Sequence, residues 1–295
     1  MSTHPSAQDE FDKGERFEFG ENWRAFLAAL NDERIAAAEL SLKTMLDVES
    51  LEGKTFVDVG SGSGLFSLAA RRLAARVHSF DYDPSSVWCT GEVRRRYFPE
   101  DGCWTIEQGS VLDQDYLQSL GKFDVVYSWG VLHHTGDLWR AMELAATPVG
   151  PGGKLFLAVY NDQGWRSRCW RLVKKAYCRA PRWVKPVILY PAALRLWGPQ
   201  TLRDFLRLKP FETWKTYQSA RGMSAWRDVV DWVGGYPFEV AKPDDIIGFY
   251  RRRGFTLCRC ETVGTGRGNN QFLFQLSKEP DHPLPHCDVN MDRTV

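Results

Sequence analysis

The residues whose types and spacing best suit ligand chemistry are a glycine-rich turn and an acidic residue that follow two neighbouring apolar runs. The run at 55–59 leads into Gly60-Ser61-Gly62-Ser63-Gly64, and glycines allow main-chain angles and close approaches that other residues disfavour. The next run, 77–80, ends at Asp81, whose carboxylate can accept hydrogen bonds from both hydroxyls of a ribose. The G-x-G-x-G spacing differs from the G-x-G-x-x-G of dinucleotide enzymes and argues against a nicotinamide cofactor.

A second carboxylate, Asp58, lies inside the otherwise apolar run that precedes the turn. An unpaired carboxylate would be costly to bury there. We therefore expect Asp58 to receive hydrogen bonds from the backbone of the turn or to orient the amino group of a bound cofactor.

Two adjacent histidines, His133 and His134, follow the apolar run at 123–128. Imidazole titrates near neutral pH, and open α/β sheets bind ligands at the carboxyl edge, so either residue could act as a general base. The alternative is that the pair only hydrogen-bonds its own loop. Tyr160 and Asn161 end the next run at the same edge and are predicted to line an acceptor pocket.

Short apolar runs alternate with helical segments from residue 55 onward, which predicts an α/β fold with a doubly wound, seven-stranded, mostly parallel sheet that ends in a β-hairpin. The predicted strands are 55–59, 77–80, 104–108, 123–128, 154–160, 255–261 and 271–277. The predicted helices between them are 65–74, 85–97, 114–120, 138–147 and 244–253. Apolar residues at helical spacing from 22 to 46 add one or two cap helices before the first strand.

Four segments in order, VDVGSGSGLFSLAA, FDYDPSS, FDVVYSWGVLHHTGD and VGPGGKLFLAVYND, resemble the successive motifs of the class I methyltransferases. They cover residues 55 to 161, and the resemblance is closest to the bacterial enzymes that methylate quinones and other small molecules. It implies that S-adenosylmethionine is the cofactor and S-adenosylhomocysteine the product.

The resemblance also implies cofactor contacts. The glycine turn and Asp81 would bind the cofactor, Ser110 and Val111 would flank the adenine, and Trp129-Gly130 would close over the methionine portion. Many relatives carry an acid where this chain has Ser110. The predicted cofactor site is Asp58, Gly60, Ser61, Gly62, Gly64, Asp81, Tyr82, Ser110, Val111, Trp129, Gly130 and Trp23.

The aromatic segment 17–23 precedes the cap helices. Its Trp23 or Phe19 could lie near the sulfonium through a cation–π contact, or the segment could only pack the cap helix on the sheet.

A sulfonium methyl is already activated, so the protein chiefly needs to align an acceptor and exclude water. Besides the histidines, Tyr236 and Glu239 are predicted as a second base or as groups that position substrate, and Asn270 as a further polar contact. The alternative for 236–239 is an ordinary turn before the last helix. No metal ligand set is predicted.

Residues 163–222 do not fit the strand and helix alternation. They hold fourteen Lys or Arg against two acids, interleaved with five tryptophans. Prolines 181, 186, 191, 199 and 210 are predicted to cut this insertion into short helices. It could be a lid over a small or lipid-linked acidic acceptor, a surface that rests on an anionic membrane, or an RNA grip, in that order.

The predicted organisation has four parts: an N-terminal tail and cap helices at 1–50, a methyltransferase core at 51–162 and 236–278, the insertion at 163–235, and a loose tail at 279–295. The first fifteen residues are expected to be mobile.

The net charge of +1 gives no global reason for a polyanionic partner. The first residues are polar and acidic, unlike a signal peptide, and we see no apolar run of membrane-spanning length, so we expect the protein in the cytoplasm. The sequence does not fix the oligomeric state.

Together these features predict transfer of a methyl group from S-adenosylmethionine to an oxygen, or less favourably a carbon or nitrogen, of a small metabolite, a glycan or a lipid-linked acceptor. The alternatives are a non-catalytic protein that binds S-adenosylmethionine and an RNA methyltransferase. No N-P-P-Y motif follows the run at 123–128, where Ser128-Trp129-Gly130-Val131 stands instead, so nucleic acid is not the expected partner.

Overall fold

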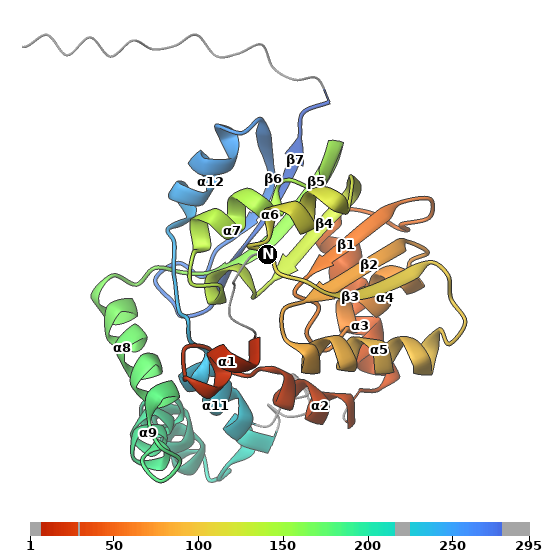
Figure 1. Cartoon of the computed structure of the whole chain (residues 1–295). Coiled ribbons are helices and arrows are strands. Elements are labelled where there is room, and N and C mark those ends of the chain that lie inside the picture. The colour runs from red at the N-terminus through yellow and green to blue at the C-terminus, as the bar shows by residue number, and fades with distance from the viewer. Residues whose placement is uncertain (1–6, 29, 216–224, 279–295) are drawn as a thin grey trace, which may run out of the picture.

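A seven-stranded sheet forms the centre of the protein (Figure 1). The computed structural model describes residues 7–28, 30–215 and 225–278. The strands run in the order β3-β2-β1-β4-β5-β7-β6, and β7 is antiparallel to both β5 and β6 while the other pairs are parallel. They are β1 (Thr55–Val59), β2 (Arg76–Asp81), β3 (Trp104–Gln108), β4 (Phe123–Trp129), β5 (Val149–Tyr160), β6 (Phe255–Glu261) and β7 (Asn269–Leu276). This confirms the predicted doubly wound sheet with a hairpin at one end.

Alternation along the strands divides the core into two apolar layers. On β1, Phe56 packs into the layer under α3, α4 and α5, whereas Val57 and Val59 face the layer under α6, α7 and α12. Helices therefore cover both faces, as a mainly parallel sheet requires. The core helices are α3 (Asp32–Leu46), α4 (Leu65–Arg72), α5 (Pro84–Tyr97), α6 (Gln114–Ser119), α7 (Leu138–Ala145) and α12 (Pro243–Arg251).

The insertion folds as a helical unit beside the sheet (Figure 1, green and cyan). Its helices α8 (Trp165–Arg179), α9 (Lys185–Leu206) and α11 (Ala225–Gly234) pack on one another. They share a small core built on Tyr177, Leu189, Ala192, Val229 and Val233. The insertion therefore has an apolar centre of its own.

The prediction that prolines divide the insertion into short helices is wrong for α9. This helix continues for 22 residues through Pro191 and Pro199. Each proline costs a main-chain hydrogen bond, but Leu189 and Ala192 bury the inner face of the helix in the insertion core. Tertiary packing thus overrides the local preference.

Part of the first fifteen residues, which are predicted to be mobile, has regular structure, and their mobility stays a prediction. Residues Ala7–Asp12 form the short helix α1, with Ala7 buried, and α2 follows at Gly20–Ala28. Both lie below the sheet (Figure 1, red), α1 beside the insertion and α2 against α5. Among the described residues, no helix combines the length and the apolarity that crossing a bilayer requires. The loose tail predicted at 279–295 lies outside the described residues.

Candidate active site

One cavity of about 1140 Å³ opens at the carboxyl ends of β1, β2, β4 and β5. Helices α9 and α11 and the segment that leads into α2 complete its wall. A space of this size exceeds the usual range for one small ligand, so it can hold a nucleoside cofactor together with an acceptor. Eleven of the twelve residues of the predicted cofactor site line it: Trp23, Asp58, Gly60, Ser61, Gly62, Asp81, Tyr82, Ser110, Val111, Trp129 and Gly130.

Two features require glycine in this turn: the backbone angles and the close approach of neighbouring side chains. Gly60 and Gly62 have φ values of 79° and 54°, in the left-handed region that favours glycine. A Cβ on Gly60 would stand 2.5 Å from the Val131 methyl groups, and one on Gly62 would stand 3.2 Å from the Trp23 ring. Trp23 therefore covers the turn from the N-terminal side, and side chains at the turn would intrude into the cavity wall.

Gly64 does not line the cavity, although the sequence placed it in the cofactor site. Its φ is 77°, and a Cβ there would lie 2.8 Å from the Thr90 Cα. Gly64 therefore allows the start of α4 to pack against α5. Its predicted contact with the cofactor stays a prediction.

Asp81 is held at the end of β2 by two backbone donors. The Gly62 N–H donates to Oδ2 and the Asp83 N–H donates to Oδ1, each at 2.9 Å. Burial raises the pKa of the Asp81 carboxyl to about 6, and the neighbouring Asp83 raises it further, against the lowering effect of the backbone donors. Asp83 itself caps α5 through Ser85 and accepts from the Gly20 N–H at 2.8 Å. The acid therefore links the turn, β2 and the N-terminal segment.

Asp58 ends a buried chain of hydrogen bonds. The Trp104 Nε1 donates to the Ser79 hydroxyl, Ser79 donates to Ser67, and Ser67 donates to Asp58 Oδ2 at 2.5 Å. The sequence predicted either backbone donors from the turn or a contact with the amino group of the cofactor. The donors in the structure are the hydroxyl and the backbone N–H of Ser67 on α4, and the contact with the cofactor stays a prediction. Burial raises the pKa of Asp58 to about 7, and the charge of Asp81 adds to this. Asp58 therefore changes its charge near neutral pH.

His134 reaches the cavity, whereas His133 lies behind it. Nδ1 of His134 lies 2.7 Å from the Pro237 carbonyl oxygen. A carbonyl only accepts, so Nδ1 carries the proton and Nε2 has the free lone pair. Burial lowers the pKa of His134 to about 3, and the charge of Lys174 lowers it further. The imidazole is therefore neutral throughout the physiological range.

His133 is fully buried against the Tyr160 ring, with 3.9 Å between ring centroids. Among the described residues, neither of its ring nitrogens has a hydrogen-bond partner. Burial lowers its pKa well below the ordinary value. His133 does not line the cavity, so a direct role as a base stays a prediction that the geometry does not support.

Of the four residues predicted to bind substrate, Tyr160 lines the cavity. Asn161 and Asn270 are buried behind it and bond to each other at 3.0 Å, and Asn161 also donates to the carbonyls of Gly264 and Gly266. The pair thus fixes the loop between β6 and β7. Asn269, one residue earlier than predicted, lines the cavity and buries an Oδ1 that has no hydrogen-bond partner among the residues that the structure describes.

Tyr236 and Glu239 lie in a separate hollow of about 270 Å³, with Glu15, Arg171 and Arg179. Burial raises the pKa of Glu239. Neither residue lines the main cavity. Their roles in catalysis and substrate binding therefore stay predictions, and no contact with the main cavity supports them.

The acceptor side of the cavity contains residues that the sequence analysis did not select. Trp232 on α11 lines it and buries an Nε1 that finds no partner within the described part of the chain. Asp228, Asp231 and Arg267 add charge there. Aromatic residues in an insertion are ordinarily read as core, and only the folding of α11 against the end of β5 brings Trp232 to Tyr160, at 5.3 Å between ring centroids.

Lys174 on α8 supports Trp232 from behind. Its side chain is fully buried, its Nζ donates to the Trp232 carbonyl, and it lies 4.3 Å from the Trp232 ring centroid. Burial lowers the pKa of Lys174 to about 7. The insertion thus places a buried cation directly behind the acceptor wall.

Residues 24–212, more than half of the chain, match the model of a protein family described as "Methyltransferase domain". The chain belongs to this methyltransferase family. Its curated relatives include ubiquinone biosynthesis O-methyltransferases from Xanthomonas euvesicatoria, 31% identical over 135 residues, and Methylocella silvestris, 29% identical over 173 residues. These matches cover 46% and 53% of this chain, and 52% and 66% of the relatives. The chain therefore spans about half to two thirds of the length of these relatives.

Among solved structures, PKMT2 from Rickettsia typhi in complex with AdoHcy is similar, with a TM-score of 0.54 and 12% identity. The match covers 82% of this chain and 53% of that one. At this identity the likeness shows the fold. It agrees with the class I methyltransferase sheet described above, and S-adenosylmethionine is the cofactor of this class.

The residues of this methyltransferase fit that cofactor. S-adenosylmethionine has a positive sulfonium and a positive amino group, and Asp58, Asp81 and Asp83 give the turn side of the cavity three carboxyl groups. Asp81 stands where it can accept from ribose hydroxyls. Ser110 and Val111 line the region beside it. The Ser110 hydroxyl accepts from the Leu112 N–H at 3.1 Å, so it shapes this loop, and its contact with the adenine stays a prediction.

Proposed function

We propose that this methyltransferase moves the methyl group of S-adenosylmethionine to the hydroxyl oxygen of a small phenolic acceptor. The observation that carries the proposal is His134, whose Nδ1 is bound to the Pro237 carbonyl while the ring lines the cavity. This leaves Nε2 as an acceptor for a hydroxyl proton. The curated relatives, which are named O-methyltransferases, support oxygen over nitrogen or carbon.

The low pKa of His134 selects among hydroxyl groups. Its burial and the nearby Lys174 disfavour the imidazolium, so His134 is a weak base. A weak base assists most when the acceptor hydroxyl is itself acidic, which favours a phenol over the alcohols of a sugar. Lys174 and Arg16 add positive charge near this ring, and such charge stabilises a developing phenolate.

The wall around the acceptor space suits an aromatic ring. Tyr160, Trp197 and Trp232 line it, and offset or edge contacts between aromatic rings are favourable. The unpartnered Trp232 Nε1 and Asn269 Oδ1 offer one donor and one acceptor for polar substituents. When bound, the cofactor supplies a methyl group already activated on sulfur, so these residues need only align the oxygen and exclude water.

The test is a panel of acceptors with methyl-labelled S-adenosylmethionine, compared between the wild type and His134→Gln. We expect label on phenols and catechols and none on aliphatic alcohols or amines. His134→Gln should lower kcat about 100-fold, because general-base assistance is typically worth two to four orders of magnitude, and should leave cofactor affinity unchanged. Full activity of His134→Gln, or transfer to alcohols or amines alone, contradicts the proposal.

A further inference from the structure

The outer face of α9 is an exposed apolar stripe. From residue 183 to residue 194 its large side chains recur three or four residues apart along one side of the helix. After Gly198, exposed apolar residues resume between 202 and 208. Val187 is 69% exposed, Leu194 72% and Leu206 77%. Trp183 just before the helix and Leu208 just after it extend the exposed apolar surface. We call this set the α9 stripe: Trp183, Val187, Tyr190, Leu194, Leu202, Phe205, Leu206 and Leu208.

The stripe is not needed to hold the helix in place. Leu189 and Ala192 on the opposite side are buried in the insertion core, and Leu196, Trp197 and Gln200 line the cavity. Scattered single apolar residues are normal on protein surfaces, whereas a contiguous apolar surface marks an interaction site. The exposed α9 stripe therefore indicates a binding surface.

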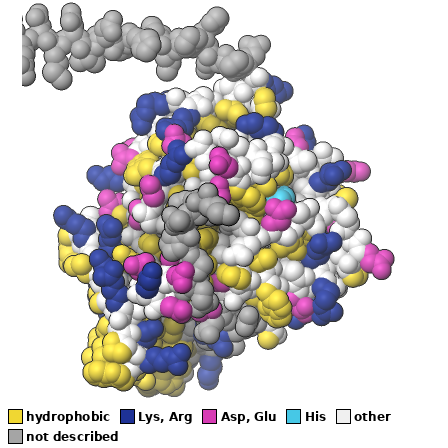
Figure 2. All heavy atoms as spheres, in the orientation of Figure 1, with side chains coloured by type: hydrophobic (Ala, Val, Ile, Leu, Met, Phe, Trp, Pro, Cys, Tyr) yellow, Lys and Arg dark blue, Asp and Glu magenta, His cyan; other side chains and the backbone are white. Residues whose placement is uncertain are grey.

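The surroundings of the stripe are strongly basic. Residues 182–215 contain seven Lys or Arg and two acids. Both acids are already engaged in local contacts. Asp204 is buried and accepts from the Thr213 hydroxyl at 2.6 Å, and Glu212 pairs with Lys209. The neighbouring helix α8 has six Lys or Arg and no acid, and all of them except the buried Lys174 add to this charge. Figure 2 shows a hydrophobic area at the lower left, where Figure 1 has α9, with Lys and Arg beside it.

We propose that the α9 stripe docks this protein on an anionic lipid surface. An apolar helix face bordered by Lys and Arg is the composition that inserts among headgroups while attracting acidic lipids. A second copy of this chain would bring two basic rims together, which like-charge repulsion opposes. RNA would meet mainly aliphatic side chains, which cannot stack with bases as aromatic rings do.

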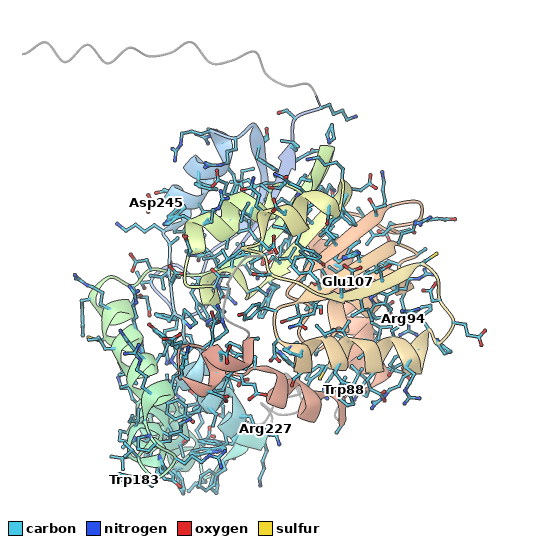
Figure 3. All side chains as sticks on the ribbon, viewed as in Figure 1. Trp88, Arg94, Glu107, Trp183, Arg227 and Asp245 are labelled. Atoms are coloured by element: carbon cyan, nitrogen blue, oxygen red, sulfur yellow. The ribbon has the colours of Figure 1, made fainter. Side chains whose placement is uncertain are left out.

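The position of α9 connects this surface with the cavity. Trp183 lies at the tip of the insertion, far from the sheet (Figure 3), while Leu196 and Trp197 on the inner side of the same helix line the cavity. One helix, about 10 Å across, therefore separates the lipid surface from the cavity. If the proposed function holds, an apolar acceptor dissolved in the bilayer has a short path to His134.

The experiment is flotation of the full chain with vesicles of phosphatidylcholine alone and of phosphatidylcholine with phosphatidylglycerol. We expect binding to the anionic vesicles that weakens with added salt. Leu194→Asp and Trp183→Asp should each lower the partition coefficient about tenfold, because each removes a large apolar contact and adds a repelled charge. The matched control is Leu40→Asp on α3, a leucine 65% exposed, which should bind vesicles as the wild type does.

Affinity for S-adenosylmethionine and the melting temperature serve as controls for folding, and we expect both to be unchanged in all three variants. The two proposals can also be distinguished, because a protein that binds vesicles but methylates no acceptor would contradict the proposed function and leave the docking surface standing. The docking surface is overturned if anionic vesicles do not bind, or if Leu40→Asp weakens binding as much as Leu194→Asp does. It is also overturned if Leu194→Asp abolishes a stable dimer or RNA retention while vesicle binding stays the same.

Discussion

Replacing Asp58 by asparagine tests whether the buried acid beside the glycine turn titrates near neutral pH. Burial raises its pKa from 3.8 to about 7. Above pH 3.8 the unfolded chain loses this proton while the folded chain keeps it, so the free energy of unfolding falls as pH rises towards about 7. Between about pH 5 and pH 8, the fall from this group alone is about 2–3 kcal/mol. Asp58→Asn cannot ionise and should lack that part of the slope.

The assay is urea unfolding of the cofactor-free protein at both pH values, followed by tryptophan fluorescence. Ser67→Ala is the matched control. It removes the hydrogen bond that lowers the pKa of Asp58, so it should extend the loss of stability to higher pH rather than abolish it. Equal pH slopes in the wild type and Asp58→Asn would refute the assignment of a raised pKa.

The same variant should separate the charge of Asp58 from its size. An ionised Asp58 attracts the cationic groups of S-adenosylmethionine, and hydrogen bonds to charged groups are worth about 1.5–3 kcal/mol. Asp58→Asn should therefore weaken cofactor binding about 10- to 100-fold at pH 8 and less near pH 5, where the wild-type carboxyl is protonated. Titration calorimetry at the two pH values measures this difference, and an equal loss at both would contradict it.

Three further substitutions probe other parts of the cavity. Asp81→Ala should weaken binding of S-adenosylmethionine at least tenfold in calorimetry, through loss of the charge-assisted ribose contact; an unchanged affinity would remove the acid from the cofactor site. Gly60→Ala should lower the free energy of unfolding by about 2 kcal/mol, since its Cβ meets Val131. Gly121→Ala, with a similar φ of 80° but nothing within 4 Å of the added Cβ, should cost less, and equal losses would show that the clash contributes nothing. Trp232→Phe keeps an aromatic ring over Lys174 but removes Nε1 together with part of the indole, so KM for the acceptor should rise several-fold while cofactor affinity stays constant; a change in cofactor affinity instead would place Trp232 on the cofactor side of the cavity.

The cofactor half of the cavity is predictable from sequence because it is local. The turn from Gly60 to Gly64 joins a strand to the next helix, and Asp81 ends the neighbouring strand. Parallel pairing of β1 with β2 then brings both to one edge of the sheet. No packing outside the sheet has to be known for these residues. Of the twelve predicted residues, eleven line the cavity, and among them Trp23 arrives from α2, outside the sheet.

The acceptor half depends on choices that the sequence leaves open. Adjacent residues on a strand face opposite sides, so a shift of one residue decides that Asn269 rather than Asn270 lines the cavity. Trp232 reaches Tyr160 only through the packing of α11 in the insertion. Pro191 and Pro199 predict helix ends locally, yet the buried side of α9 keeps the helix continuous.

The most direct test of the central claim is to supply the purified protein with S-adenosylmethionine labelled with ¹³C on the methyl group and a bacterial extract, and then to identify the labelled product by NMR. The account predicts a methoxy signal on a phenolic small molecule or lipid, absent from Asp81→Ala and strongly reduced in His134→Gln. Label on nitrogen, carbon or RNA would contradict oxygen transfer to a phenol. No label despite measured cofactor binding would contradict catalysis and favour a protein that only binds S-adenosylmethionine.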